Sequence, residues 1–279
     1  MNRPLISTEW LAANLASLRV VDGSWHMPAD NRDGAAEFVA ARIPGAVHFD
    51  IEAISDQASP LPHMLPSPED FAAAVGALGI ASTDSLVVYD GRGLFSAARL
   101  WWMFRVMGHE DVAVLDGGLP RWVAEGRAIE SGTAEAPEPR TFVPRFRPDL
   151  VRDADQVLRV AESRAAVILD ARAADRFRGE APEPRPGLRS GHIPGSTNLP
   201  WPTLLKEGAL LPSAGLAQRF AETGIDLDRP IVTTCGSGVS AATISLALAV
   251  LGRWDVPIYD GSWSEWGGDE SFPIATGRL

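Results

Sequence analysis

Short apolar runs alternate with longer apolar-periodic segments in both halves of the chain. In the first half, SLVVYD at residues 85–90 precedes AARLWWMFRVMG at 97–108. In the second half, PIVTT at 230–234 precedes SAATISLALAVLG at 240–252. Short β-branched runs are typical of strands, and the longer segments are typical of helices. The alternation therefore predicts an α/β fold with helices flanking mostly parallel sheets.

The same pattern occurs twice along the chain. ARIPGAVHFD at residues 41–50 corresponds to GHIPGSTNLP at 191–200, and VAVLDGGLPRW at 112–122 corresponds to VPIYDGSWSEW at 256–266. Corresponding segments follow one another in the same order at nearly constant spacing, which indicates a duplicated structural unit.

A proline-rich stretch separates the two copies. Residues 126–148 have no helical period, which is typical of an exposed connector. We therefore expect an N-terminal domain over residues 1–125, a linker over 126–148 and a C-terminal domain over 149–279.

Composition and charge narrow the class of protein. The net charge of −11 disfavours nucleic acid or an anionic membrane as partner. The apolar runs are shorter than the roughly 18 residues of a membrane span, and the N-terminal residues lack the apolar stretch of a signal peptide. A single cysteine cannot form a disulfide within the chain, and the five histidines show no metal-ligand spacing. We expect a cytoplasmic protein without metal or organic cofactor.

That single cysteine, Cys235, lies in VTTCGSGVSAA at residues 232–242, between a predicted strand and a predicted helix. Ligands of parallel sheets collect at the carboxyl ends of strands. Loop amides and a helix N-terminus favour a thiolate over a thiol. The sister half has Asp90 at the matching place, so we interpret Cys235 as reactive. The predicted sulfur-binding loop consists of Gly236, Ser237, Gly238, Val239 and Ser240.

Two other uses of such a loop do not fit the sequence. A cysteine phosphatase needs an arginine six positions after the nucleophile to clamp phosphate, and this position is Ala241. A nucleotide phosphate loop needs Gly-Lys-Ser/Thr, and the loop contains no lysine. A thiolate nucleophile with a target other than a phosphoryl group remains.

Several motifs resemble the tandem rhodanese-domain sulfurtransferases. They are the loop CGSGVS, the two IPG motifs, SPLPHMLP at 59–66 and YDGSWSEWG at 259–267. The resemblance runs from about residue 7 to about residue 275 and is to the bacterial 3-mercaptopyruvate type. It implies two rhodanese-like domains. It also implies that Cys235 takes sulfur from 3-mercaptopyruvate as a persulfide, releases pyruvate, and passes the sulfur to cyanide or to a thiol such as that of thioredoxin.

The resemblance also implies roles for two arginines and two loop residues. Arg176 and Arg185 match the family's paired arginines, which hold the carboxylate and keto oxygen of the donor. Thiosulfate enzymes of the family usually carry basic residues directly after the cysteine, where this chain has Gly236 and Ser237. The resemblance therefore favours mercaptopyruvate over thiosulfate as the sulfur donor.

A proposed Asp–His–Ser relay in the family is less well matched. Ser237 matches the serine and Asp33 the acid, whereas Arg42 stands at the position expected for the histidine. Arginine cannot act as a base near neutral pH, so Arg42 would hold Asp33, stabilise negative charge or bond its own turn. His48 and His63 are further candidates that could reach the site.

Three functions remain open at this point. Besides the mercaptopyruvate enzyme, they are a thiosulfate:cyanide sulfurtransferase and a non-catalytic rhodanese module that binds a partner or senses oxidants. The chain keeps both the thiol and the paired arginines, and it has no resolving cysteine for a redox sensor. These features favour an enzyme.

Overall fold

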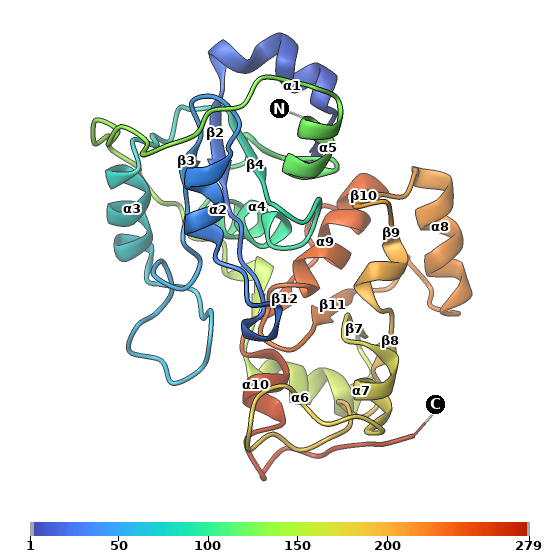
Figure 1. The fold of residues 1–279 in the computed structure, drawn as a ribbon. Coiled ribbons are helices and arrows are strands. Elements are labelled where there is room, and N and C mark those ends of the chain that lie inside the picture. Colours follow the sequence, from blue (N-terminus) through green and yellow to red (C-terminus); the bar gives the residue numbers. More distant parts are fainter. Residues whose placement is uncertain (1–2, 278–279) are drawn as a thin grey trace. The chain divides into compact units, whose positions relative to one another are not determined.

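The computed structural model describes residues 3–277, which form two compact units (Figure 1). Unit 1 contains the residues up to Gln57, Leu65–Arg147 and Lys206–Leu210. Unit 2 contains Ala58–Met64, Pro148–Leu205 and the residues from Leu211 onward. The segments Ala58–Met64 and Lys206–Leu210 therefore belong to a different unit from the residues on either side of them in the sequence.

Unit 1 is built on a five-stranded parallel sheet with the strand order β1-β5-β4-β2-β3. The central strand β4 is buried at all four positions, as expected for a strand covered on both faces. The strands are β1 Leu5–Ile6, β2 Arg19–Asp22, β3 Val47–His48, β4 Leu86–Tyr89 and β5 Val112–Leu115. The helices are α1 Thr8–Asn14, α2 Gly34–Ala40, α3 Pro68–Ala77, α4 Ala97–Val106 and α5 Gly118–Ala124.

Unit 2 repeats this topology with the order β6-β12-β11-β7-β8, again parallel. The strands are β6 Val151–Arg152, β7 Val167–Asp170, β8 Thr197–Asn198, β11 Ile231–Thr234 and β12 Ile258–Tyr259. The helices are α6 Ala154–Ser163, α7 Ala174–Arg178, α8 Ser213–Glu222, α9 Ala241–Val250 and α10 Ser262–Trp266. The predicted α/β fold with a duplicated unit is confirmed.

Short elements complete the chain. A separate two-stranded sheet pairs β9 Leu205–Lys206 with β10 Ala209–Leu210. The 3₁₀ helices are η1 Leu15–Ser17, η2 Pro28–Asp30, η3 Pro148–Leu150 and η4 Trp201–Leu204. In residues 3–277, no helix has the length and apolar character needed to cross a membrane.

The stretch predicted to be an exposed linker is bonded to unit 1 along its length. Glu130 forms an antiparallel bridge with Arg42, and the amide of Arg145 donates to the carbonyl of Met107 at 2.8 Å. The two units divide between Arg147 and Pro148. Proline removes donors but leaves carbonyls and the remaining amides free to pair. The stretch therefore lies against unit 1 without forming a helix.

The helices that follow β4 and β11 are buried on all sides. Helix α9 is apolar apart from Thr243 and Ser245, and nine of its ten residues are buried. Helix α4 also buries two arginines, whose guanidinium groups lie 4.4 Å and 5.0 Å from the rings of Trp102 and Trp101 respectively. Close packing of the surrounding residues holds each helix in place, and hence fixes the direction of the loop before it.

Candidate functional site

Cys235 lies in the turn between β11 and α9, at the carboxyl edge of the parallel sheet in unit 2. The residue is 2% exposed. Its carbonyl accepts a hydrogen bond from the amide of Trp263 at 3.0 Å, and the carbonyl of Gly236 accepts one from the amide of Ser264 at 2.9 Å. The start of α10 therefore fixes the backbone of the cysteine.

The hydroxyl of Ser262 holds the loop from inside. Its Oγ accepts hydrogen bonds from the amides of Cys235 at 3.2 Å and Gly238 at 3.1 Å, and it donates to the carbonyl of Tyr259 at 2.8 Å. Ser262 has a φ of 51°, in the left-handed region that serine rarely adopts. The loop therefore surrounds the side chain of Ser262, whose Oγ accepts hydrogen bonds from two of the loop amides.

Other amides of the loop remain available to a ligand. Within residues 3–277, four loop amides donate no hydrogen bond; they belong to Gly236, Ser237, Val239 and Ser240. Buried backbone N–H groups are nearly always paired. Several unpaired amides beside a buried thiol form a suitable environment for an anionic sulfur atom.

The sister loop in unit 1 shows what such a loop binds. Asp90 follows β4 and is 1% exposed. Its carboxylate accepts hydrogen bonds from the amides of Arg92 at 2.8 Å, Phe95 at 2.6 Å and Ala97 at 2.9 Å. The same turn between strand and helix therefore places amides around an anionic group on the residue that matches Cys235.

A persulfide on Cys235 would place its charged atom as far along the side chain as this carboxylate does. The outer sulfur of Cys–S–S⁻ is three bonds from Cα, as is each carboxylate oxygen of aspartate. By sequence correspondence, the amides of Arg92 and Phe95 match those of Ser237 and Ser240. Both of these are among the unpaired amides of the Cys235 loop, so the loop can hold a persulfide as its sister holds a carboxylate.

His63 contacts the Cys235 loop through a hydrogen bond. Its Nδ1 lies 3.0 Å from the Oγ of Ser237, and both residues are buried. His63 belongs to the segment Ala58–Met64 that groups with unit 2, and its φ is 61°. From the sequence, His63 was only one of two further histidines that could reach the site, because its partner Ser237 lies 174 positions away.

Arg42 and Asp33 have other partners, within unit 1. Nη1 of Arg42 donates to the carbonyl of Gly132 at 2.6 Å, and its Nε lies 3.5 Å from Glu130. Asp33 caps α2 by accepting from the amide of Ala36 at 3.1 Å. In the part of the chain that the structure describes, no contact joins the two side chains. These contacts join the Arg42 side chain to residues of the 126–148 stretch.

Asp33 also lines a cavity of about 310 Å³ in unit 1. His48 lines the same cavity, and its Nδ1 lies 3.9 Å from Asp22. Across residues 3–277, no group of three His, Cys, Asp or Glu side chains is placed to hold a metal ion.

Arg176 reaches the Cys235 loop. A methyl group placed on Gly236 would lie 3.4 Å from Nη2 of Arg176. The same guanidinium contacts Glu183, with Nη2 to Oε2 at 2.5 Å and Nε to Oε1 at 3.4 Å. Arg185, the second predicted substrate-binding arginine, is half-buried and lies two residues beyond Glu183. Arg176 is therefore next to the residue that follows the nucleophile.

Arg172 is a buried charge near the site that the sequence analysis did not single out. It binds Asp170 through Nε and Nη2, at 3.0 Å and 2.6 Å to Oδ2, and Glu183 through Nη1 at 2.9 Å. Its guanidinium lies 4.1 Å from the ring centre of Trp263. The sequence feature that could have identified Arg172 is its position two residues after Asp170, at the end of a strand.

The charges around Arg172 keep it protonated. Burial acts to lower its pKa, but the negative charges and hydrogen bonds of Asp170 and Glu183 and the charge of Cys235 outweigh this effect and raise the pKa. A permanent positive charge near Cys235 can attract an anionic group bound at the loop.

His192 and five tryptophans are packed within the two units. Burial lowers the pKa of His192, which stacks on Phe177 with ring centres 3.8 Å apart and an interplanar angle of 9°. Five tryptophans are buried; they are Trp101, Trp102, Trp122, Trp263 and Trp266.

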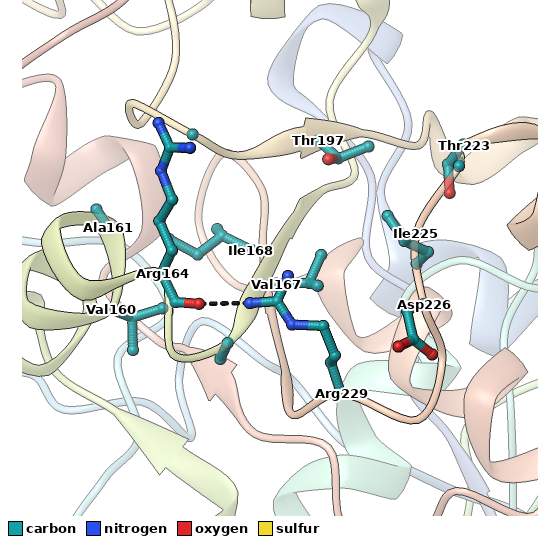
Figure 2. Close-up of a pocket in the computed structure, with 13 residues that line it drawn as sticks. Val160, Ala161, Arg164, Val167, Ile168, Thr197, Thr223, Ile225, Asp226 and Arg229 are labelled. Carbon is teal, nitrogen blue, oxygen red and sulfur yellow. Dashed lines mark hydrogen bonds between the residues drawn. The ribbon is translucent and has the colours of Figure 1, made fainter.

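Unit 2 also has a cavity of about 450 Å³ (Figure 2). It lies by Val167, at the amino end of β7, whereas Cys235 follows the carboxyl end of the parallel strand β11. On its rim, Nη2 of Arg229 donates to the carbonyl of Arg164 (Figure 2). The cavity therefore lies near the amino ends of the parallel strands, whereas the thiol lies at their carboxyl ends.

A duplicated parallel α/β unit, with a thiol loop in one copy and a carboxylate loop in the other, is the architecture expected of tandem rhodanese-domain proteins. The chain belongs to the rhodanese family, since the Rhodanese-like domain model matches residues 7–125 and 153–269.

Individual relatives match nearly the whole chain. The chain is 45% identical to 3-mercaptopyruvate sulfurtransferase of Escherichia coli K12, over 96% of each protein. It is 48% identical to the mitochondrial thiosulfate/3-mercaptopyruvate sulfurtransferase 1 of Arabidopsis thaliana, over 98% of this chain and 78% of that protein. The crystal structure of the 3-mercaptopyruvate sulfotransferase SseA from Escherichia coli superimposes with a TM-score of 0.86 at 43% identity, over 94% of this chain and 99% of that one.

Proposed function

We propose that this protein is a sulfurtransferase that moves sulfur from 3-mercaptopyruvate to an acceptor through a persulfide on Cys235, with release of pyruvate. The observation that carries the proposal is the placement of Cys235, which is buried in a loop with unpaired amides and next to Arg176. The proposal is further supported by relatives named for this activity that match almost the full length of the chain.

The first half-reaction balances with the donor and the thiolate alone. The thiolate of Cys235 attacks the donor sulfur, a S–S bond forms, and the C–S bond of mercaptopyruvate breaks. The electron pair of that bond goes to C3, giving the enolate of pyruvate, and the proton of the donor thiol is finally bound at C3. The products are Cys–S–S⁻ and pyruvate, and the loop amides stabilise the charge on the outer sulfur.

Each neighbouring group has a part in this step. Arg176 and Arg185 bind the carboxylate and keto oxygen of the donor, since a guanidinium can donate two parallel hydrogen bonds to a carboxylate. Ser237 and His63 handle the donor proton, because an imidazole hydrogen-bonded to a hydroxyl can take up a proton near neutral pH. His63 thus fills the part for which Arg42 is unsuited.

The second half-reaction returns Cys235 to the thiolate. Cyanide attacks the outer sulfur and leaves as thiocyanate, or an acceptor thiolate attacks it and leaves as a persulfide. A dithiol such as that of thioredoxin is a suitable physiological acceptor. Because the carrier functions as a free thiol, we place the protein in a reducing compartment such as the cytoplasm.

Thiosulfate is the second candidate donor. The name of the Arabidopsis relative includes both donors, and the amide-lined loop can hold the persulfide from either. The neutral side chains of Gly236 and Ser237 favour mercaptopyruvate, because a dianion gains most from basic residues at these positions. A non-catalytic module would not need the thiol and Arg176 to lie together.

Steady-state transfer to cyanide tests the proposal. Pyruvate and thiocyanate are measured with 3-mercaptopyruvate, and sulfite and thiocyanate with thiosulfate, on the wild type and on Cys235→Ser. The proposal predicts equal amounts of pyruvate and thiocyanate, a higher kcat/KM for mercaptopyruvate than for thiosulfate, and loss of both activities in the variant. Activity that persists in Cys235→Ser would contradict the assignment of the carrier.

A further inference from the structure

Glu183 is a buried carboxylate shared by two arginines of the site. Its side chain is 1% exposed. Oε1 accepts from Nη1 of Arg172 at 2.9 Å, and Oε2 accepts from Nη2 of Arg176 at 2.5 Å. The two guanidinium groups are therefore linked through one carboxylate.

Arg172 is held rigidly on its other sides. Asp170 binds it through two guanidinium nitrogens, and Nη2 also donates to the carbonyl of Gly191 at 2.8 Å. The ring of Trp263 covers its face. Because Arg172 is 1% exposed and bonded in this way, it is a fixed anchor for Glu183. Glu183 in turn fixes the direction of the Arg176 side chain, which is 22% exposed.

Glu183 also changes the charge beside the thiol. Asp170 and Glu183 together balance the charges of Arg172 and Arg176, so these four groups have no net charge. The loop residues nearest to Arg176 are uncharged. In the proposed site, a donor with one negative charge is matched by the charge of Arg185 and a directed hydrogen bond from Arg176, whereas a dianion exceeds the positive charge that remains.

We propose that Glu183 positions Arg176 for the donor carboxylate and, by offsetting its charge, makes the site select singly charged sulfur donors over dianionic ones. This inference rests on the proposed function and deepens it. It assigns the donor preference to a residue outside the Cys235 loop, in addition to the neutral side chains within the loop.

The test compares Glu183→Gln with Glu180→Gln. Glutamine keeps the size of the side chain and removes its charge. Glu180 lies three residues earlier and forms an exposed pair with Arg178, so it is a matched control outside the site. The measured quantity is the ratio of kcat/KM for 3-mercaptopyruvate to kcat/KM for thiosulfate. Both values come from the same preparation, so the ratio does not depend on the folded fraction.

The inference predicts that Glu183→Gln shifts this ratio about tenfold towards thiosulfate, because an added net positive charge at short range stabilises the dianion more than the monoanion. Glu180→Gln leaves the ratio unchanged. Glu183→Asp keeps the charge but shortens the reach to Arg176, so it raises KM for both donors to a similar extent and keeps the ratio near that of the wild type. An unchanged ratio in Glu183→Gln, whatever the loss of rate, overturns the inference.

A binding experiment separates this result from failure of the proposed function. Calorimetry measures the affinities of pyruvate and sulfate for Cys235→Ser, with and without Glu183→Gln, and needs no turnover. The inference predicts that Glu183→Gln increases the affinity for sulfate relative to pyruvate about tenfold. If the wild type transfers no sulfur but this shift is seen, the proposed function fails while the charge selection by Glu183 stands. If the shift is absent, the inference fails.

Discussion

Nδ1 of His63 lies 3.0 Å from the hydroxyl of Ser237, which is two residues beyond Cys235. In the proposed mechanism this pair supplies a base for the donor proton, since mercaptopyruvate carries its sulfur as a thiol. We predict that His63→Asn lowers kcat for mercaptopyruvate about 10²-fold, the lower range for loss of an acid–base group. Asparagine keeps a hydrogen-bonding side chain at this position, which limits the effect on folding.

Thiosulfate is the internal control for that variant. Its transferable sulfur bears no proton, so transfer from thiosulfate should fall much less than transfer from mercaptopyruvate. Rapid-mixing measurements of persulfide formation with each donor check this difference. An equal loss with both donors would mean that His63 supports the loop without handling the proton.

Arg176 is expected to act through donor binding. Lysine keeps the charge but loses the two parallel hydrogen bonds of a guanidinium, so Arg176→Lys should raise KM for mercaptopyruvate about tenfold or more. Arg178 lies two residues further along α7 and pairs with Glu180 at the surface, so Arg178→Lys is a matched control. Steady-state kinetics of both variants test the prediction, and a KM equal to that of the wild type in Arg176→Lys would contradict it.

The carboxylate of Asp90 is predicted to stabilise unit 1 through its three amide partners. Asp90→Asn replaces one acceptor oxygen by an amide nitrogen and removes the charge, which should cost about 2 kcal/mol of the free energy of unfolding. Urea unfolding of the variant and the wild type measures this cost. A loss no larger than that of Asp33→Asn, in which an exposed helix cap changes, would show that the Asp90 loop is not an anion site.

Acid should destabilise the protein through its buried histidines. Burial lowers the pKa of both His192 and His109 in the folded protein. The unfolded chain therefore binds protons more readily, so stability is complete above the ordinary histidine pKa of about 6.5 and falls as the pH drops below it. We predict that His192→Gln makes the loss of unfolding free energy between pH 7 and pH 5 smaller. An unchanged pH dependence would exclude His192 as a cause.

The sequence predicted the parts of the molecule that depend on local pattern. The duplicated α/β unit, the strand-end position of Cys235 and the matching place of Asp90 follow from strand and helix periodicity and from alignment of the two halves. Arg176 lies near Gly236, and this arginine had been marked by the family resemblance and not by local pattern.

The contacts that sequence reasoning missed are set by how the chain folds in space and not by local pattern. His63 meets Ser237 only because the segment Ala58–Met64 groups with unit 2. The role of Glu183 depends on two arginines whose side chains converge in space, which spacing alone does not reveal. Matching a histidine to position 42 relied on the nearby IPG motif, although in the structure Arg42 is bonded to Glu130 and Gly132.

The central claim is that Cys235 carries the sulfur. Its most direct test is the intact mass of the wild type and of Cys235→Ser after incubation with 3-mercaptopyruvate and no acceptor. The account predicts a gain of about 32 Da, one sulfur atom as a persulfide, on the wild type only, and its removal by cyanide. No gain on the wild type, or the same gain on Cys235→Ser, would contradict it.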